Sequence, residues 1–241
     1  MINTYKESDL HRTLKAIYAL NEDAETEVQK DGFIYDILTK KDEVIEIQTQ
    51  NPGKLLKKIQ KVLSLNKKCT VVFPLIVKKT IETYSIEGNL IKKTHGTKKE
   101  NEYTMLKNLT SLYSVLLQEG FTLKVPFITI TEKRRQTKEA EQSENGRRHF
   151  KKNWQKENKY LNELLFEKTF SCKKDYISLL PKNLPKIFCA KDIKDALKSD
   201  VEKPKNAWQN ANLIAWLFVR MNIFKYIETK GKTKYYKLKN E

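Results

Sequence analysis

Apolar residues recur along the first third of the chain with two different periods, and the alternation of these periods predicts an α/β fold. Helical spacing marks the segments Glu7–Ala19 and Lys54–Leu65. Strand-type runs occupy Phe33–Leu38 and Val44–Thr49 and are joined by a short polar turn. The run Cys69–Val77 is almost entirely apolar, which is typical of a central strand covered on both faces. The order helix, strand pair, helix, buried strand predicts a mixed sheet flanked by helices.

The middle of the chain continues this pattern and then changes in residue composition. A second strand pair is expected over Thr80–Lys93, an amphipathic helix over Glu102–Gln118, and a returning strand over Phe121–Thr131. The segment Glu132–Lys159 then holds ten Lys or Arg residues against five Glu, with almost no aliphatic residues. We interpret this segment as a basic connector that contains the domain boundary.

The carboxyl-terminal part has the element order of a winged helix, a small DNA-binding module. Helical patterns come first, and a pair of strands around a basic, glycine-containing turn closes the chain. The expected helices are Tyr160–Thr169, Asp175–Leu180, Phe188–Ser199 and Asn206–Met221, and the strand pair is Phe224–Leu238. The sequence therefore predicts a first domain over residues 1–132, a connector over 133–159 and a winged helix over 160–241.

The charge of the chain narrows the choice of partner. The formal net charge is +17 at pH 7, and a field of that sign attracts polyanions, of which nucleic acid is the usual one. A membrane surface is the alternative polyanion, but no basic amphipathic helix with a wide apolar face is evident. No run of about 18 apolar residues occurs, and the start MINTYKESD has no apolar signal core. We expect a cytoplasmic, nucleoid-associated protein that binds double-stranded DNA and no membrane.

The first strand pair places one acidic side chain in each apolar ladder, Asp36 and Glu46. Buried carboxylates are costly unless something neutralises them, so they either cap local backbone groups or hold a cation. A hairpin centred on Lys40 and Lys41 would make the two acids cross-strand neighbours on one face, with Gln48 beside Glu46. Two converging carboxylates repel each other, and a divalent cation with oxygen ligands relieves that repulsion.

These residues carry a resemblance to a known superfamily. The pattern D-x9-E-x-Q, preceded by a helix with a glutamate and followed by a helix and an apolar strand, resembles the PD-(D/E)XK, or restriction-endonuclease-like, nucleases. The chain is also similar to uncharacterised bacterial members that carry a carboxyl-terminal winged helix. The resemblance implies that Asp36 and Glu46 bind the metal, Mg²⁺ or Mn²⁺. Its third acid corresponds to Glu7, with Glu27 as the second candidate.

The sequence departs from the superfamily at one position, because Gln48 stands where its catalytic lysine is expected. An amide can orient a water or a phosphate oxygen but supplies no positive charge. Some members of the superfamily carry glutamine here and remain active. Lys54, Lys57 or Lys58, on the next helix, could supply the charge, and His11, one turn after Glu7, could touch phosphate or act as a base.

The predicted winged helix offers the residues for DNA binding. Asn and Gln side chains can contact adenine, and lysines can contact phosphates or guanine. The three wing lysines stand at alternate positions and are expected to share one face. Trp216, inside the long helix, is expected in the core. The nucleic-acid-binding candidates are Lys203, Lys205, Asn206, Trp208, Gln209, Asn210, Lys230, Lys232 and Lys234, with Arg147 and Arg148 of the connector.

Together these features predict a Mg²⁺-dependent DNA endonuclease that hydrolyses phosphodiester bonds, with Glu7, Asp36, Glu46 and Gln48 as catalytic residues. The alternative is a DNA-binding or regulatory protein on an inactive nuclease fold, which needs no metal at the two acids. An RNA-directed nuclease is a third option, although no RNA-binding aromatic signature is evident. A symmetric cut of a duplex requires two active sites, so a homodimer is one arrangement to test.

Overall fold

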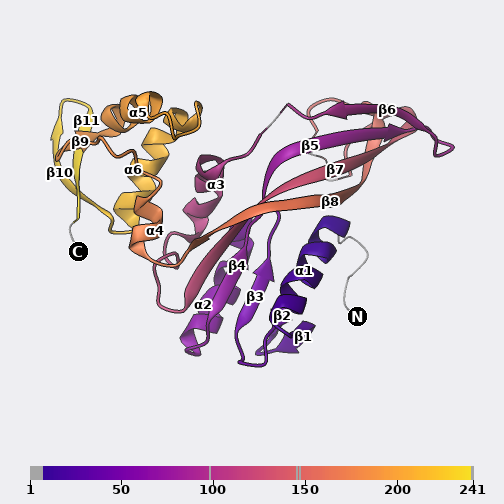
Figure 1. Cartoon of the computed structure of the whole chain (residues 1–241), viewed down its shortest axis with the longest axis horizontal. Coiled ribbons are helices and arrows are strands. Elements are labelled where there is room, and N and C mark those ends of the chain that lie inside the picture. The colour runs from indigo at the N-terminus through magenta and orange to yellow at the C-terminus, as the bar shows by residue number, and fades with distance from the viewer. Residues whose placement is uncertain (1–7, 98, 145, 147, 240–241) are drawn as a thin grey trace.

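The protein is described by a computed structural model, which places residues 8–97, 99–144, 146 and 148–239 (Figure 1). Its largest feature is an eight-stranded mixed sheet in the order β1-β2-β3-β4-β7-β5-β6, with β8 paired to β7. The expected α/β architecture with a mixed sheet flanked by helices is confirmed at this level. Within the described residues no helix is long and apolar enough to cross a membrane.

The first part of the sheet is an antiparallel meander followed by a helical crossover. Strands β1 (Glu25–Lys30), β2 (Phe33–Leu38) and β3 (Val44–Ile47) pair in sequence order. The 3₁₀ turn η2 (Pro52–Leu55) and helix α2 (Leu56–Ser64) then lead to β4 (Cys69–Val72), which runs parallel to β3. A parallel neighbour requires such a crossover, which is why α2 covers the sheet here.

Helices cover both faces of this part of the sheet. Helix α1 (Asp9–Asn21) buries Leu10 and Leu14 against Ile45 and Ile47 on one face. Its first turn is capped by Ser8, whose hydroxyl accepts a hydrogen bond from the backbone of His11. On the other face lie α2 and α3 (Glu102–Leu109), which form a separate and larger core. Two faces packed against helices explain why the strands are rich in apolar residues.

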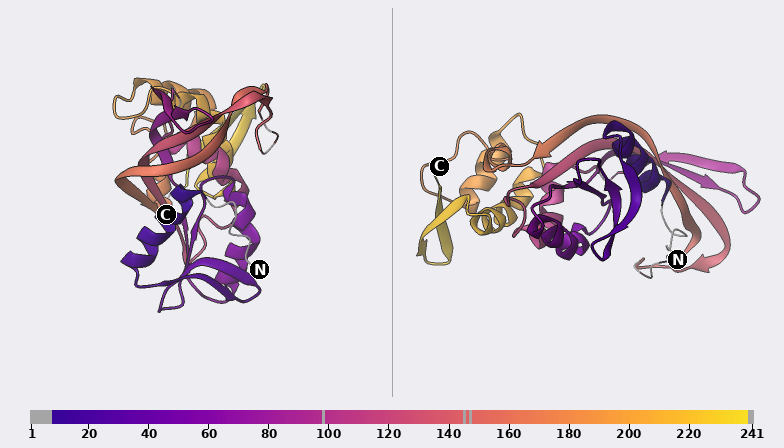
Figure 2. Two further views of the ribbon diagram at one scale, coloured as in Figure 1. Left: turned by 90° about the vertical axis from the view of Figure 1, so that its right-hand side faces the viewer. Right: turned by 90° about the horizontal axis from the view of Figure 1, so that it is seen from below.

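A long ribbon of strands extends from the sheet on the side away from the carboxyl-terminal module (Figures 1 and 2). It consists of β5 (Leu75–Tyr84), β6 (Leu90–His95), β7 (Phe121–Glu141) and β8 (Lys152–Phe170). The strand pair expected over Thr80–Lys93 is confirmed, and the returning strand at Phe121 is longer than expected. The apolar run that begins at Cys69 is divided between β4 and β5.

The ribbon corrects the prediction of a basic connector, because most of residues 133–159 belongs to β7 and β8. The helix expected over Tyr160–Thr169 is also wrong, since this segment is strand. The β7–β8 register shifts between Phe127 and Ile128 and again two residues later, so that single residues of β8 are left out of the pairing. These bulges give the apolar positions of β8 a spacing that imitates a helix.

The remaining chain forms the carboxyl-terminal module. Helix α3 is shorter than the predicted segment to Gln118, because the 3₁₀ turn η3 (Thr110–Leu112) follows it directly. In the module, a three-stranded sheet has the order β10-β11-β9. The elements are α4 (Lys173–Ile177), β9 (Phe188–Cys189), α5 (Ala190–Ser199), the 3₁₀ turn η4 (Ala207–Asn210), α6 (Ala211–Arg220), β10 (Phe224–Lys230) and β11 (Thr233–Leu238).

The module is joined to the sheet by a continuous hydrophobic core. Buried residues of α3, such as Leu109, belong to the same cluster as Ile214 of α6. The buried hydroxyl of Tyr103 on α3 also donates a hydrogen bond to the carbonyl oxygen of Leu179 at 2.7 Å. The two parts therefore share one core, and α3 is the element between them.

Candidate functional site

The two acids of the first strand pair meet where the β2–β3 ladder ends. The register pairs Ile37 with Ile45, which places Asp36 and Glu46 opposite each other. Each carboxylate accepts a hydrogen bond from the other strand. The backbone N–H of Ile47 donates to Asp36 Oδ2 at 2.8 Å, and that of Asp36 donates to Glu46 Oε1 at 3.4 Å. At this end of the β2–β3 ladder, the two carboxylates accept backbone N–H hydrogen bonds from the opposite strand, so each acid also caps a backbone group.

Strand β2 changes the face of the sheet to which its side chains point at Asp36. Tyr35 packs in the core on the α2 face, whereas Ile37 packs in the core under α1. Residues at positions i and i+2 of a regular strand face the same way, so the strand is sharply twisted between them. At this twist the Asp36 carboxylate lies 3.7 Å from His11 of α1, and Glu46 opposite it pairs with Lys58 of α2.

Glu46 is a buried carboxylate with a lysine partner. Its exposed fraction is 1%, and both of its oxygens accept hydrogen bonds of 2.8 Å from the ammonium of Lys58 on α2. Burial raises the pKa of Glu46 to about 7, and the charge of Asp36 adds to this rise, while Lys58 opposes it. Lys58 also donates to the carbonyl oxygen of Ile34 at 2.6 Å, which fixes the ammonium at the site.

Helix α1 brings a histidine to the same place. The Nε2 atom of His11 lies 2.7 Å from the carbonyl oxygen of Ile47 and 3.7 Å from Asp36 Oδ2. The predicted third acid, Glu7, lies outside the described residues. The second candidate, Glu27 on β1, forms an ion pair of 2.6 Å with Lys15 of α1.

Of the residues expected to complete the site, Lys58 contacts Glu46, whereas the Gln48 side chain bonds to a neighbouring loop residue. Of the three candidate lysines, Lys58 on α2 pairs with Glu46, whereas Lys54 lies in η2 and Lys57 is exposed on α2. The side chain of Gln48 hydrogen-bonds to the carbonyl oxygen of Gln50, and its backbone N–H to Val72. The expectation that Gln48 lies beside Glu46 therefore finds no supporting contact in the structure.

The donor set at this edge suits a hard cation. It comprises the carboxylates of Asp36 and Glu46 and the carbonyl oxygen of Ile47, all oxygen ligands of the type that Mg²⁺ takes. Like-charge repulsion between the two acids contributes to the raised pKa of Glu46, and a divalent cation would relieve it. Among the described residues, no group of three or more His, Cys, Asp or Glu side chains is arranged for a metal ion.

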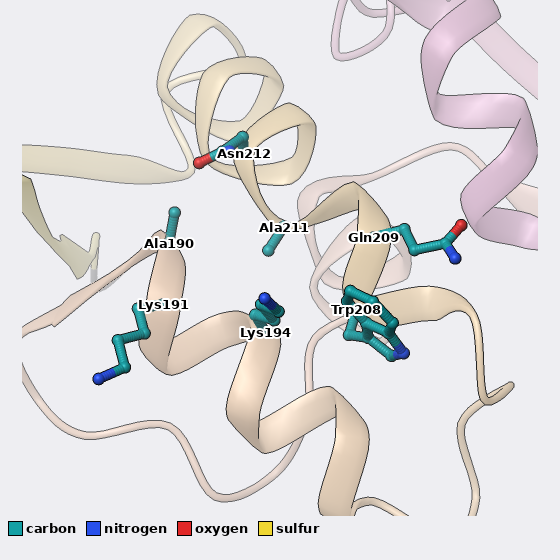
Figure 3. Close-up of a pocket in the computed structure, with 7 residues that line it drawn as sticks. All are labelled: Ala190, Lys191, Lys194, Trp208, Gln209, Ala211 and Asn212. Carbon is teal, nitrogen blue, oxygen red and sulfur yellow. The ribbon is translucent and has the colours of Figure 1, made fainter.

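In the carboxyl-terminal module, two of the predicted DNA-binding residues, Trp208 and Gln209, line a cavity of about 320 Å³ (Figure 3). It lies between the start of α5 and the η4–α6 segment, with Trp208, Gln209 and Asn212 on the latter. The indole of Trp208 lies under two lysines of α5, Lys194 at 4.9 Å and Lys198 at 4.8 Å. The cavity is thus bordered by amides, an indole and ammonium groups.

The other predicted DNA-binding residues are scattered around the module. Asn206 accepts a hydrogen bond from Asn101, and Lys203 donates to the carbonyl oxygen of Ser178. Lys205 is exposed and Asn210 is half-buried. Arg147 lies outside the described residues. Arg148 is not part of the module, because its guanidinium lies 4.2 Å from the centre of the Trp154 ring on β8 of the ribbon.

The expectation that the wing lysines share one face is wrong. Lys230 pairs with Thr233, and Lys234 pairs with Thr229, in adjacent rungs of the β10–β11 ladder. Because adjacent rungs face opposite sides, Lys230 and Lys234 point to different faces, and Lys232 lies in the turn. The hairpin carries charge around its tip rather than on one side.

Trp216 is not in the core, contrary to the sequence expectation. It is 43% exposed and meets Tyr113, which follows η3, in an edge-to-face contact with a centroid distance of 5.9 Å. Arg220, one turn later on α6, lies over both rings. The face of α6 that carries Trp216 and Arg220 therefore packs against Tyr113. Because Tyr113 lies against this face, it limits how deeply α6 could enter a groove of DNA.

Sequence reasoning missed the lysines of α5. Lys191, Lys194 and Lys198 follow the spacing i, i+3, i+7, so they share one helix face, and the first two line the cavity. The signal was present in the segment AKDIKDALKS, whose lysines alternate with buried apolar residues.

Comparisons with known proteins give a family but no activity. A family model described as "Domain of unknown function (DUF8091)" matches residues 8–171, the segment from α1 to the end of β8. An uncharacterized protein of Treponema pallidum (strain Nichols) is 26% identical over 192 residues, which cover 80% of this chain and 73% of that protein. No solved structure matches the chain. The acidic site and the ribbon lie within the same matched segment.

Proposed function

The chain belongs to the family of the domain of unknown function DUF8091, and we propose that it is a Mg²⁺-dependent DNA endonuclease. The observation that carries the proposal is the meeting of Asp36 and Glu46 at the end of β3, with the Lys58 ammonium 2.8 Å from both Glu46 oxygens. Two acids that could hold a metal, with an ammonium group beside them to offset charge on a phosphate, are suited to metal-assisted phosphodiester hydrolysis.

The order of elements supports a restriction-endonuclease-like core. The meander β1–β3, the crossover α2 and the parallel strand β4 follow the order expected from the resemblance. In the carboxyl-terminal module, the order helix, strand, helix, helix and strand pair, with β9 beside β11, is typical of a winged helix. This module would supply affinity for DNA through its α5–η4 surface.

Each side chain of the site has a role in this proposal. Asp36, Glu46 and the Ile47 carbonyl would hold Mg²⁺, which when bound acidifies a water and offsets charge on the phosphate and leaving oxygen. Lys58 would supply the positive charge that Gln48 lacks, and it lowers the pKa of Glu46 against the opposing effects of burial and Asp36. His11, fixed by the Ile47 carbonyl, would contact the phosphate or exchange a proton.

Cleavage of plasmid and oligonucleotide DNA tests the proposal. Wild-type protein with Mg²⁺ or Mn²⁺ should cut. Asp36→Ala and Glu46→Gln should each lose at least about 100-fold in rate, because mutation of even an outer-shell partner of a metal ligand typically costs about 10- to 100-fold. Glu43→Gln is the matched control, because Glu43 pairs with Lys68 outside the site. Its cutting should equal that of the wild type.

One observation favours a second candidate, a DNA-binding protein on an inactive nuclease core. Lys58 already neutralises Glu46 through both oxygens, so the acid is paired without a metal. If the wild type binds DNA tightly, cuts nothing with either metal, and keeps its affinity in Asp36→Ala, the catalytic proposal is refuted and this candidate remains.

A further inference from the structure

The ribbon contains an unusual concentration of positive charge around one buried acid. Glu132, on β7, is 1% exposed. Four cationic side chains from three strands surround it, and together with Glu132 we call them the Glu132 cluster. They are Lys79 of β5, Arg134 of β7, and Lys156 and Lys159 of β8.

Arg134 alone neutralises the acid. Its Nε and Nη2 atoms donate to Glu132 Oε1 at 2.7 and 2.5 Å, and its guanidinium is stacked on Trp154 at 3.8 Å from the ring centre. The ammonium groups of Lys79 and Lys156 lie farther out, 3.3 and 3.5 Å from Oε2. The acid is therefore shared by more cations than its charge can balance.

Lys159 makes the excess of charge larger. Within the described residues it forms no ion pair, and Glu100, whose carboxylate accepts a hydrogen bond from the backbone of Ile76, is the other acid that acts on it. Burial lowers the pKa of Lys159, and the like charges of Lys156 and Lys79 lower it further. Crowded ammonium groups repel one another, so an added anion would stabilise the cluster.

The cluster lies beside the candidate active site. Its neighbour on β8, Asn158, exchanges hydrogen bonds with Asp9 in the first turn of α1. In the same turn, two residues on, His11 contacts the Ile47 carbonyl and approaches Asp36. Two residues of a helix span about 3 Å along its axis. The first turn of α1 thus contacts both β8 next to the cluster and the acidic site, so one nucleic-acid strand could reach both.

We propose that the Glu132 cluster is a second phosphate site, where Lys79, Lys156 and Lys159 hold the backbone of the DNA strand next to the phosphate that is cut. The proposal rests on the function proposed above for Asp36 and Glu46. Arg134 is the structural partner of Glu132, and the three lysines supply the binding charge. Phosphate contacts of this kind position a strand without reading its sequence.

Salt-dependent DNA binding tests the proposal. The probes are a labelled 20-base-pair duplex and its 20-base single strand, with EDTA present so that no metal-dependent cutting occurs. The double variant Lys156→Gln with Lys159→Gln is compared with the wild type. The matched control is Lys92→Gln with Lys138→Gln, which removes the same charge from two exposed lysines of the same ribbon.

Loss of two phosphate contacts should make the negative slope of log K against log salt shallower by about 1.8 for the duplex. It should also weaken binding about 60-fold at 0.1 M salt. The control variant should change both quantities by less than half as much. The melting temperature of the Lys156 and Lys159 variant should equal or exceed that of the wild type, since repulsion is removed.

Two results would overturn the proposal. Equal changes in both double variants would mean that only overall charge matters. A lower melting temperature with an unchanged salt slope would mean that the lysines support the fold. Cleavage with Mg²⁺ separates the two proposals: a reduced slope without any wild-type cutting keeps the phosphate site and refutes the nuclease, whereas cutting with an unchanged slope does the reverse.

Discussion

Replacement of Lys58 by methionine would isolate the energy of the buried ion pair with Glu46. Methionine keeps most of the lysine stem and removes the ammonium group, which lies 5.8 Å from the centre of the Tyr35 ring. The group removed lies 2.8 Å from both oxygens of an acid that is 1% exposed. At this distance, with an effective dielectric constant of about 20, the gross attraction is roughly 6 kcal/mol.

The net effect depends on pH, because the ion pair exists only when Glu46 is ionised. The pKa of Glu46 is about 7, raised by burial and by Asp36. At pH 5.5 Glu46 is mostly protonated in the folded wild type, so Lys58→Met should cost less than about 1 kcal/mol. Without Lys58 the pKa of Glu46 rises further, and the cost grows by about 1.4 kcal/mol per pH unit above 7, to about 2 kcal/mol at pH 8.5.

Urea unfolding at pH 5.5, 7.0 and 8.5 measures this cost. The control is Lys57→Met, because Lys57 is the next residue on α2 and is exposed. In a Glu46→Gln background, the cost of Lys58→Met should not depend on pH, because position 46 then carries no titrating carboxylate. A destabilisation by Lys58→Met that is the same at all three pH values, or larger at pH 5.5, would refute the reasoning.

Three further predictions concern the scaffold. Gly53→Ala should destabilise the protein by about 1 to 3 kcal/mol in urea unfolding, because the new Cβ would lie 2.5 Å from Ser111 Oγ, and Ser111→Gly should restore stability. Backbone hydrogen bonds, led by that of Ser171, hold the pKa of Asp175 below its usual value. The stability that Asp175 adds is therefore complete above about pH 4, and the thermal stability difference from Asp175→Asn should shrink as the pH falls below that value. Leu109→Ala, in the core shared by the sheet and the module, should lower stability by about 2 to 5 kcal/mol. Calorimetry should still show one unfolding transition, and two separate transitions would contradict a shared core.

The elements with regular packing were predictable from their own residues. The segments around α1 and α2 show one clean helical period each, because one face of each helix is buried against the sheet. The β2–β3 pair was recognisable as two short apolar runs joined by a polar turn, because both faces of these strands are covered by helices. The ribbon was not predictable in this way. Much of β7 and β8 is exposed on both faces, so its charged residues carry no alternation that would indicate a strand.

The candidate site was predictable in part. Two acids in adjacent apolar strands indicated that Asp36 and Glu46 lie together, since strand pairing leaves few other arrangements. That Lys58 rather than Lys54 or Lys57 reaches Glu46 depends on how α2 packs on the sheet. The position of His11 likewise depends on the placement of α1 over β3.

By itself the sequence determined the α/β class, the pair of acids, the large positive charge and, from Asp175 onward, the succession of helices closed by a strand pair. Each of these depends on local periodicity or on residue type, which a linear sequence contains. Only the tertiary structure decided that the basic segment is a ribbon, that Trp216 faces Tyr113, and that lysines from separate strands gather at Glu132. Those features come from pairing between residues far apart in the chain, and no local pattern encodes the partner of such a pair.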